Sequence, residues 1–184
     1  MVVMKTPNGW CVTSTANSFP RRFAVPRSDF HLIALTPTAC AFLADPDYLR
    51  THRLTTKVQL IAEAGTAGDP SRAVDGVIPQ QGVQWDSPLS VVLTSPTSFI
   101  EVTVPDADVN GIFLSVDGSD VYEVQCIRAD GRSTSLGTVL AGVPIGMGTG
   151  LLFSNELAGC RAVRVMPQSG DGYYSVGEIG FLKR

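Results

Sequence analysis

Charged side chains are scarce in this chain of 184 residues. They make up 17% of the sequence against 44% hydrophobic residues, so the chain can bury a proper core and is not intrinsically disordered. The formal net charge of -3 argues against a general affinity for the nucleic-acid backbone. Helix-favouring Lys and Glu are also rare, while Gly, Pro, Val, Thr and Ser are plentiful. This composition favours short strands joined by turns, with no nucleic-acid partner.

Catalytic motifs are missing as well. The two histidines, His31 and His52, lie near no GxSxG elbow or similar nucleophile motif, which argues against a Ser-His-Asp arrangement. The glycine-rich stretch GVPIGMGTG lacks the GK[ST] ending of a phosphate-binding loop. The candidates for the carboxylate pair of a glycoside hydrolase all stand in turn-like contexts, namely Asp106, Asp108, Asp117 and Asp120. We therefore predict that the chain is not an enzyme.

The sequence has no stretch typical of a membrane span or of a cleaved secretion signal. Residues 133–155 are uncharged but contain Pro144 and five glycines, which favours loops and strands over a lipid-facing helix. The first residues, MVVMKTPNGW, have Pro and Gly where the apolar run of a signal peptide should lie. We expect a chain without a membrane span that either works in a cytoplasm or reaches the outside without a cleaved signal.

The four cysteines are widely spaced, at Cys11, Cys40, Cys126 and Cys160. They form no CxxC pair and have no histidine cluster nearby, which argues against a zinc site. We expect buried free thiols, with a disulfide between Cys11 and Cys160 as the alternative.

From about residue 55 onward, apolar and polar residues alternate. In SFIEVTVP, for example, Ile100, Val102 and Val104 share one face, while Phe99, Glu101 and Thr103 share the other. Half-buried antiparallel strands require this period of two. The other residues expected to face the core are Val58, Leu60, Ala62, Ile112, Leu114, Val116, Tyr122, Val124, Cys126, Val163, Val165, Ile179 and Phe181. Asp-Gly pairs at 75–76, 117–118, 130–131 and 171–172 suit tight turns between such strands, so the pattern predicts a β-sandwich or barrel.

Residues 1–54 lack the alternation, and we interpret them as an N-terminal docking arm ahead of a sandwich formed by residues 55–184. Thr36-Pro37 and Asp45-Pro46 each place an N-cap residue before a proline, which predicts short helices over 37–44 and 46–53. HLIAL, residues 31–35, predicts a buried strand. The residues expected to anchor the arm to other subunits are Trp10, Phe19, Arg21, Arg22 and Phe23.

Four stretches occur in an order that resembles the discoidin-like domains (coagulation factor 5/8 type C, galactose-binding-like). They are KVQLIAEAGTAGDPSRAVDG with Trp85 after it, SFIEVTVPDADVNGIFLSV, VYEVQCIRADG and CRAVRVMPQSGDGYYSVGEIGF. The resemblance covers residues 55–184 and implies an antiparallel jelly-roll β-sandwich. It also implies that the closing stretch GDGYYSVGEIGFLKR pairs back into the sheet, where its glycines permit close packing.

The resemblance further implies a binding domain. Members that recognise sugars use loops at one end of the sandwich, with aromatic stacking and a few polar side chains. Carried onto this chain, that description nominates Trp85, Asp86, Tyr173 and Tyr174 as ligand-binding residues. Adjacent strand residues face opposite ways, so we expect at most one of the two tyrosines to be buried and the other exposed. For Trp85 the alternative is a plug in the core.

Many members of the family also hold a structural calcium ion near the Asp-Gly turn, which would nominate Asp75 and Glu178 as ligands. Calcium takes six to eight oxygen ligands, and these two residues are the only side chains that the resemblance supplies. The chain also inserts VIPQQGVQ between the turn and Trp85, and it lacks the threonine usual there. We therefore expect no cofactor; a calcium ion is the alternative to a turn cap at Asp75 and a packed Glu178.

These inferences combine into a functional hypothesis. Sandwich modules with docking arms are common building blocks of virus particles, so we expect a non-enzymatic structural and binding module of a multi-subunit particle. A phage tail or virion surface, assembled in the cytoplasm without a signal peptide, is the expected setting, with other subunits and a glycan as partners in an oligomer. The alternatives are a free-standing carbohydrate-binding module or lectin, a hydrolase accessory domain, and a cytoplasmic location.

Overall fold

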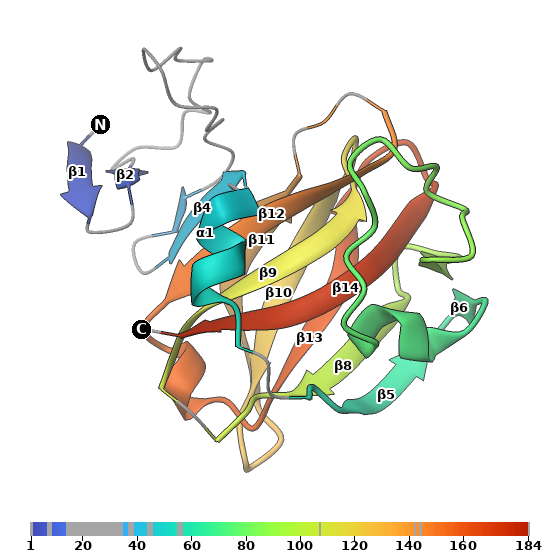
Figure 1. Ribbon diagram of the computed structural model, residues 1–184. Coiled ribbons are helices and arrows are strands. Elements are labelled where there is room, and N and C mark those ends of the chain that lie inside the picture. The colour runs from blue at the N-terminus through green and yellow to red at the C-terminus, as the bar shows by residue number, and fades with distance from the viewer. Residues whose placement is uncertain are drawn as a thin grey trace.

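Two antiparallel β-sheets pack face to face in the computed structural model of the chain (Figure 1). The structure describes residues 2–6, 9–13, 35–36, 39–43, 46–54, 57–106, 108–141, 143 and 145–183, and it describes side chains from residue 49 onward. The prediction of an all-β antiparallel sandwich is confirmed. Among the described residues, no helix is long and apolar enough to cross a membrane.

The two sheets differ in size. The five-stranded sheet has the order β11-β10-β13-β8-β5, with bounds Ser133–Leu140, Val121–Ile127, Ala162–Ser169, Phe99–Thr103 and Leu60–Ala64. The seven-stranded sheet has the order β3-β4-β12-β9-β14-β7-β6, with bounds Leu35–Thr36, Ala39–Leu43, Met147–Ser154, Val109–Asp117, Tyr174–Lys183, Val91–Leu93 and Thr66–Ala67. A separate hairpin and three short helices complete the described elements: β1 (Val2–Thr6), β2 (Gly9–Thr13), α1 (Pro46–His52), η1 (Pro70–Val74) and η2 (Leu157–Gly159).

The core lies between the sheets and contains the residues that the alternation predicted. Leu60, Ala62 and Val104 are half-buried, and Val58 is buried at the margin of the core. The remaining predicted residues are buried in one cluster, namely Ile100, Val102, Ile112, Leu114, Val116, Tyr122, Val124, Cys126, Val163, Val165, Ile179 and Phe181. Because a strand places every second side chain on the same face, the period of two was sufficient to identify this surface.

Strand β14 lies inside the seven-stranded sheet, paired with β9 on one side and with β7 on the other. The expectation that the closing stretch pairs into the sheet is therefore confirmed. Gly180 faces outward from this strand, and a Cβ atom there would lie 2.2 Å from the ring of Phe113 on β9. Only glycine permits this close approach, which explains why the final strand is rich in that residue.

Part of the predicted arm joins the seven-stranded sheet. Residues 39–43 pair with β12, and β3 pairs with β4. The helix predicted over 37–44 is therefore wrong, because backbone pairing with the edge of β12 outweighs the local Thr-Pro signal. The second prediction is confirmed, since α1 begins at Pro46 and lies over β14 (Figure 1).

The residues predicted to anchor the arm fall largely outside the described chain. Trp10 lies in strand β2. Phe19, Arg21, Arg22 and Phe23 lie outside the described residues. Their role in docking to other subunits stays a prediction from the sequence.

Glu101 of β8 faces the outside of the five-stranded sheet, as the alternation predicted, yet it is buried. Two arginines cover it: its Oε1 accepts a hydrogen bond from Arg161 at 3.0 Å and its Oε2 accepts one from Arg164 at 2.8 Å. The guanidinium of Arg164 also lies 4.2 Å from the centre of the Phe99 ring. An outward carboxylate is thus removed from water with its charge balanced.

A disulfide joins Cys126 and Cys160, whose Cα atoms lie 5.3 Å apart. The expectation of free thiols is wrong for these two residues, and a bond between Cys11 and Cys160 is excluded because the sulfur of Cys160 is already used. The cause is tertiary: β10 pairs with β13, and the amide of Arg161 donates to the carbonyl of Ile127 at 2.8 Å. This pairing brings together two cysteines that are 34 residues apart in the sequence.

Closing a loop of this length restricts the unfolded chain, so we expect the disulfide to contribute about 4 kcal/mol to the free energy of unfolding. Urea unfolding of the Cys126→Ala/Cys160→Ala double variant measures the loss. Peptide mapping of the wild-type chain without reductant should show residues 126 and 160 in one cross-linked fragment. Two unlinked fragments would contradict the pairing.

Candidate functional site

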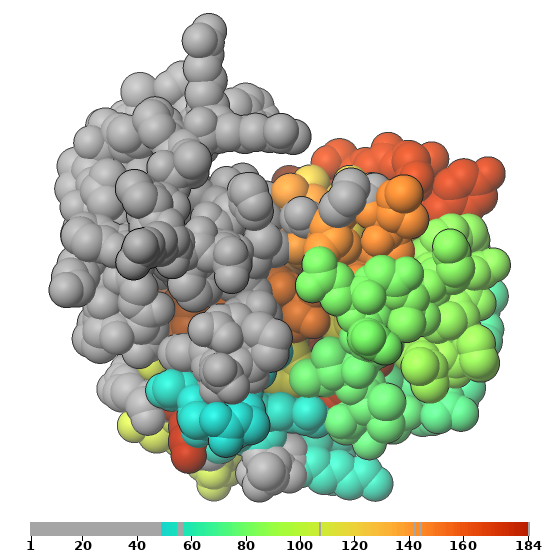
Figure 2. Space-filling view, turned by 45° about the horizontal axis from the view of Figure 1, so that its top comes forward, coloured from blue at the N-terminus to red at the C-terminus, as the bar shows by residue number. Residues whose placement is uncertain are grey.

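Several loops meet at one end of the sandwich. The long loop of residues 77–90 is hydrogen-bonded to the start of β12: the amide of Gly82 donates to the carbonyl of Met147 at 2.8 Å, and the amide of Met147 donates to the carbonyl of Val83 at 2.7 Å. Figure 2 shows these two segments, green and orange, side by side on one face. The turn between β9 and β10 and the turn between β13 and β14 reach the same end. The loops that the sequence nominated for binding are therefore neighbours in space.

Trp85 and Tyr173 form an aromatic pair at this end. Their ring centroids lie 5.2 Å apart with an angle of 38° between the ring planes. Tyr173 is 59% exposed, and Trp85 is half-buried in its turn, where its carbonyl accepts a hydrogen bond from the Ser90 hydroxyl. The predicted Asp86 is exposed beside Trp85 in the sequence. Two rings from loops almost ninety positions apart thus share one surface.

Tyr174, the fourth residue nominated for ligand binding, lies in the core and is 5% exposed. Its ring packs edge-on against Tyr122 with centroids 6.3 Å apart. The expectation that one tyrosine is exposed and the other buried is confirmed, because β14 begins at Tyr174 and Tyr173 lies in the turn just before it. Tyr173 is therefore the tyrosine that a ligand could reach.

A buried carboxylate holds the turn that presents Tyr173. Asp120 is fully buried, and its Oδ1 accepts a hydrogen bond from the amide of Asp171 at 3.1 Å. The Oδ1 of Asp171 in turn accepts from the amide of Tyr173 at 3.0 Å. A Cβ atom at Gly170 would lie 1.7 Å from Asp120 Oδ1, so only glycine allows this approach. Asp117, by contrast, caps its own turn at Ser119, as a turn residue is expected to do.

The environment of Asp120 raises the pKa of its carboxyl group to about 6. Burial is the largest cause, and the nearby charges of Asp117 and Asp171 act in the same direction. The hydrogen bond from the amide of Asp171 opposes them. Burial likewise raises the pKa of Asp117. The end of the sandwich that carries the aromatic pair is therefore acidic, and its charge changes near neutral pH.

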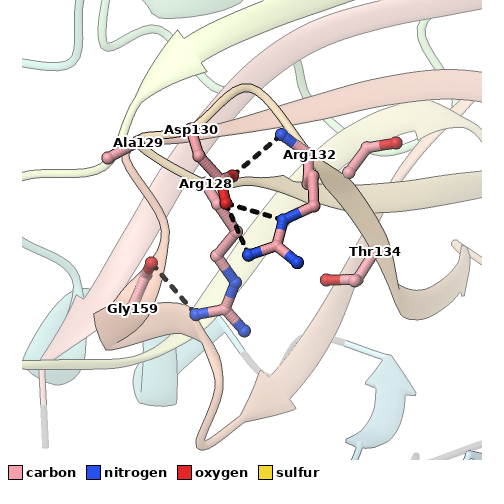
Figure 3. Close-up of a pocket in the computed structure, with 7 residues that line it drawn as sticks. Arg128, Ala129, Asp130, Arg132, Thr134 and Gly159 are labelled. Carbon is pink, nitrogen blue, oxygen red and sulfur yellow. Dashed lines mark hydrogen bonds and ion pairs between the residues drawn. The ribbon is translucent and has the colours of Figure 1, made fainter.

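A hollow of about 750 Å³ lies at the other end of β10 from the aromatic pair, and no pattern in the sequence indicated it (Figure 3). Its residues come from the β10–β11 turn, the start of β11 and η2, and they are Arg128, Ala129, Asp130, Arg132, Ser133, Thr134 and Gly159. Arg128 donates to the carbonyl of Gly159 at 3.1 Å and pairs with Glu156. Arg132 pairs with Asp130 at 2.6 Å. Each arginine is thus paired with an acidic residue of the same chain, so the positive charges of the hollow are already balanced.

The two residues nominated for calcium lie at one turn but face different partners. The Oδ1 of Asp75 accepts from the amide of Val77 at 2.8 Å, and its Oδ2 pairs with Arg72 at 3.1 Å. Asp75 therefore caps the turn. Within the described part of the chain, no three His, Cys, Asp or Glu side chains form a group that could hold a metal ion.

Glu178, the other nominated ligand, is 3% exposed in the middle of β14. Its Oε2 accepts from the amide of Gly76 at 3.1 Å, and its Oε1 pairs with Arg53 at 3.5 Å. Burial raises the pKa of Glu178 to about 7, while the Gly76 amide and the Arg53 cation act in the opposite direction. The residues present at this turn do not fit a calcium site.

Comparisons with known proteins agree with this architecture. No protein-family model matches the chain, and no curated protein matches its sequence. Solved structures do match, and they show that the chain has the discoidin-like, galactose-binding-like β-sandwich fold. The fold implied by the sequence resemblance is therefore confirmed.

The similar structures include carbohydrate-binding modules and lectin domains. The lectin domain of lectinolysin complexed with Lewis B antigen has a TM-score of 0.53 and 14% identity, covering 70% of this chain and 94% of that one. A CBM32 module of a family 31 glycoside hydrolase from Clostridium perfringens has a TM-score of 0.50 and 14% identity, and the match covers 76% of this chain and 100% of that module. A larger ZmpB structure from Clostridium perfringens, with two CBM32 domains and a catalytic domain, has a TM-score of 0.58 and 12% identity. The match covers 81% of this chain and 17% of the larger one.

The Asp120 carboxyl gives a pH-dependent prediction. Its pKa of about 6 in the folded protein lies above the ordinary value of 3.8 for an aspartate, so the stability that a protonated Asp120 provides is complete below pH 4 and is lost as pH rises through 6. Asp120→Asn keeps an acceptor for the Asp171 amide and removes the charge. We expect the variant to gain roughly 2–3 kcal/mol over wild type between pH 4.5 and pH 8.

Thermal unfolding of both proteins across this pH range checks the expectation. Asp86→Asn is the matched control, because it removes an exposed carboxylate from the same end of the sandwich. A stability difference between Asp120→Asn and wild type that does not change with pH would contradict the assignment.

Proposed function

We propose that this domain is a non-catalytic carbohydrate-binding module whose ligand stacks on Trp85 and Tyr173. The exposed aromatic pair carries the proposal. The C–H face of a sugar ring packs on the flat apolar face of an aromatic side chain, and tyrosine adds a polar tip for a hydroxyl group. The two rings lie in contact at an angle of 38°, and the exposed Tyr173 extends the apolar surface of the half-buried Trp85; we call this surface the aromatic platform.

Polar side chains around the platform suit hydroxyl groups. The loop that carries Trp85 also exposes Gln80, Gln81 and Gln84, whose amides both donate and accept hydrogen bonds. Asp86 and Asp171 add exposed acceptors. Residues 77–90, 117–120 and 169–173 contain no lysine or arginine, so the platform offers no charge complement to a sulfated or carboxylated sugar. The favoured ligand is a neutral or amino sugar.

The platform is held in place before a ligand arrives. Backbone hydrogen bonds to Met147 fix the Trp85 loop, and the buried Asp120 fixes the turn before Tyr173. A preorganised site loses less conformational entropy on binding than a flexible loop would.

The kinds of domain that share the fold support the proposal. The lectinolysin domain is described with Lewis B antigen, and other similar structures are CBM32 modules. Such modules are not catalysts, in keeping with the prediction that this chain is not an enzyme. The fold itself hosts many functions, so the aromatic pair, and not the likeness, identifies the ligand surface.

The setting of the domain stays a prediction from the sequence. Membership of a phage tail or virion, other subunits as partners and a larger oligomer are all compatible with glycan binding and are not required for it. The Cys126–Cys160 disulfide favours an extracellular or virion setting over the cytoplasmic alternative, because structural disulfides persist in oxidising surroundings.

A glycan array probed with the full chain tests the proposed function. We expect binding to neutral or amino-sugar glycans, and we expect Tyr173→Ala and Trp85→Ala each to weaken binding to the best array glycan by roughly tenfold. Ile61→Ala is the control, because Ile61 is an exposed apolar residue on β5 of the other sheet.

Wild-type affinity in the Tyr173→Ala variant would show that the ligand binds elsewhere. A flat response across the array would overturn the carbohydrate-binding function itself. Circular dichroism of each variant separates loss of binding from loss of folding.

A further inference from the structure

Arg53 occupies the corner between the Asp-Gly turn at residues 75–76 and strand β14. We propose that its guanidinium is a built-in cation of this turn, in the place where the family resemblance implies a calcium ion. The fold would then obtain from its own chain the positive charge that the buried Glu178 requires.

The contacts of the guanidinium are those expected of such a cation. Arg53 Nη2 donates to the carbonyl of Gly76 at 3.0 Å and pairs with Glu178 Oε1 at 3.5 Å. The other carboxylate oxygen, Oε2, accepts from the amide of Gly76 at 3.1 Å. One arginine nitrogen and one glutamate thus hold both backbone groups of Gly76.

Burial makes the cation necessary. The side chain of Glu178 is 4% exposed, and a buried carboxylate is costly unless its charge is balanced. The Arg53 side chain is 28% exposed, and its guanidinium carbon lies 5.3 Å from the centre of the Phe113 ring. Contact with the aromatic face adds a favourable interaction that a hydrated metal ion would not make in this position.

The backbone positions Arg53 for this role. Its amide donates to the carbonyl of Leu49 at 2.9 Å at the end of α1, and the residue forms a β-bridge with Leu182 of β14. The amide of the next residue, Leu54, donates to the carbonyl of Phe181 at 2.9 Å. The cation therefore comes from the segment before residue 55, and it fixes that segment to strand β14.

The same contacts oppose calcium. The ion needs six to eight oxygen ligands, whereas this corner offers the Glu178 carboxylate and the Gly76 carbonyl, and Arg53 contacts both. Asp75 is occupied by the Val77 amide and by Arg72. A divalent ion placed beside the guanidinium would also be repelled by it.

The primary test uses the full wild-type chain. Thermal unfolding in millimolar calcium chloride and in EDTA should give the same midpoint, and elemental analysis of the purified protein should find no stoichiometric calcium. A calcium-dependent rise in the midpoint, or one calcium ion per chain, would overturn the proposal. Neither measurement depends on glycan binding, so failure here and failure of the proposed function are distinguishable.

Variants of the full chain test the role of the charge. In EDTA, at a pH above the pKa of about 7 that burial gives Glu178, Arg53→Met keeps an apolar side chain of similar reach and should lower the midpoint by roughly 5–10 °C, because it leaves the ionised Glu178 buried and unbalanced. Arg72→Met is the matched control, since its partner Asp75 lies at the exposed edge of the same turn, and it should change the midpoint little.

The double variant Arg53→Met/Glu178→Gln completes the test. Its unfolding midpoint should lie well above that of Arg53→Met and closer to that of wild type, because the neutral amide at residue 178 needs no balancing charge. An Arg53→Met midpoint equal to that of wild type would overturn the proposal, and so would a double variant that is less stable than Arg53→Met.

Discussion

Strand β14 is buried on both faces, and this burial determines where the neighbouring charges and aromatic rings can lie. The strand pairs with β9 and β7, and its residues from Tyr174 to Leu182 are buried whichever face they point to. Ile179 and Phe181 fill the space between the sheets, while Gly180 lets the Phe113 ring approach from the neighbouring strand. Because neither face of this strand contacts solvent, a charged side chain on it loses its hydration, and Glu178 therefore requires a partner of opposite charge. Tyr173, the residue immediately before the strand, is the first that can turn outward.

Two buried carboxylates organise the loops that leave the sheets. Asp120 accepts from the turn that leads to Tyr173, and Glu178 accepts from the turn that begins the loop carrying Trp85. Each binds a backbone amide, which converts a flexible connection into one of defined direction. Burial raises the pKa of both carboxyl groups, that of Glu178 to about 7 and that of Asp120 to about 6, but their neighbours differ: Glu178 faces the Arg53 cation, whereas Asp120 faces other acidic residues. The aromatic platform rests on both.

The sandwich and the platform contribute different parts of the proposed function. The sandwich is shared with structures of 11–14% identity, so the fold does not depend on one particular sequence. The platform depends on particular residues on loops, where a change alters ligand choice without altering the core. The hollow at Arg128 shows the contrast: its charged groups are paired with one another, whereas the Trp85–Tyr173 surface leaves apolar area facing water.

The sequence alone predicted the class of fold and the inward faces of β8, β9, β10, β13 and β14, because alternation along a strand is a local rule. Alternation identified Ile112, Leu114 and Val116 as inward-facing. The adjacency of Tyr173 and Tyr174 predicted that one of them would be buried and the other exposed. Contacts between distant segments were decided by the tertiary structure alone. It converted the predicted helix over 37–44 into a strand beside β12, joined Cys126 to Cys160, placed Trp85 against Tyr173 and brought Arg53 to Glu178. No local pattern encodes these pairs, since each depends on how two sheets close and on which buried charge then needs a neighbour.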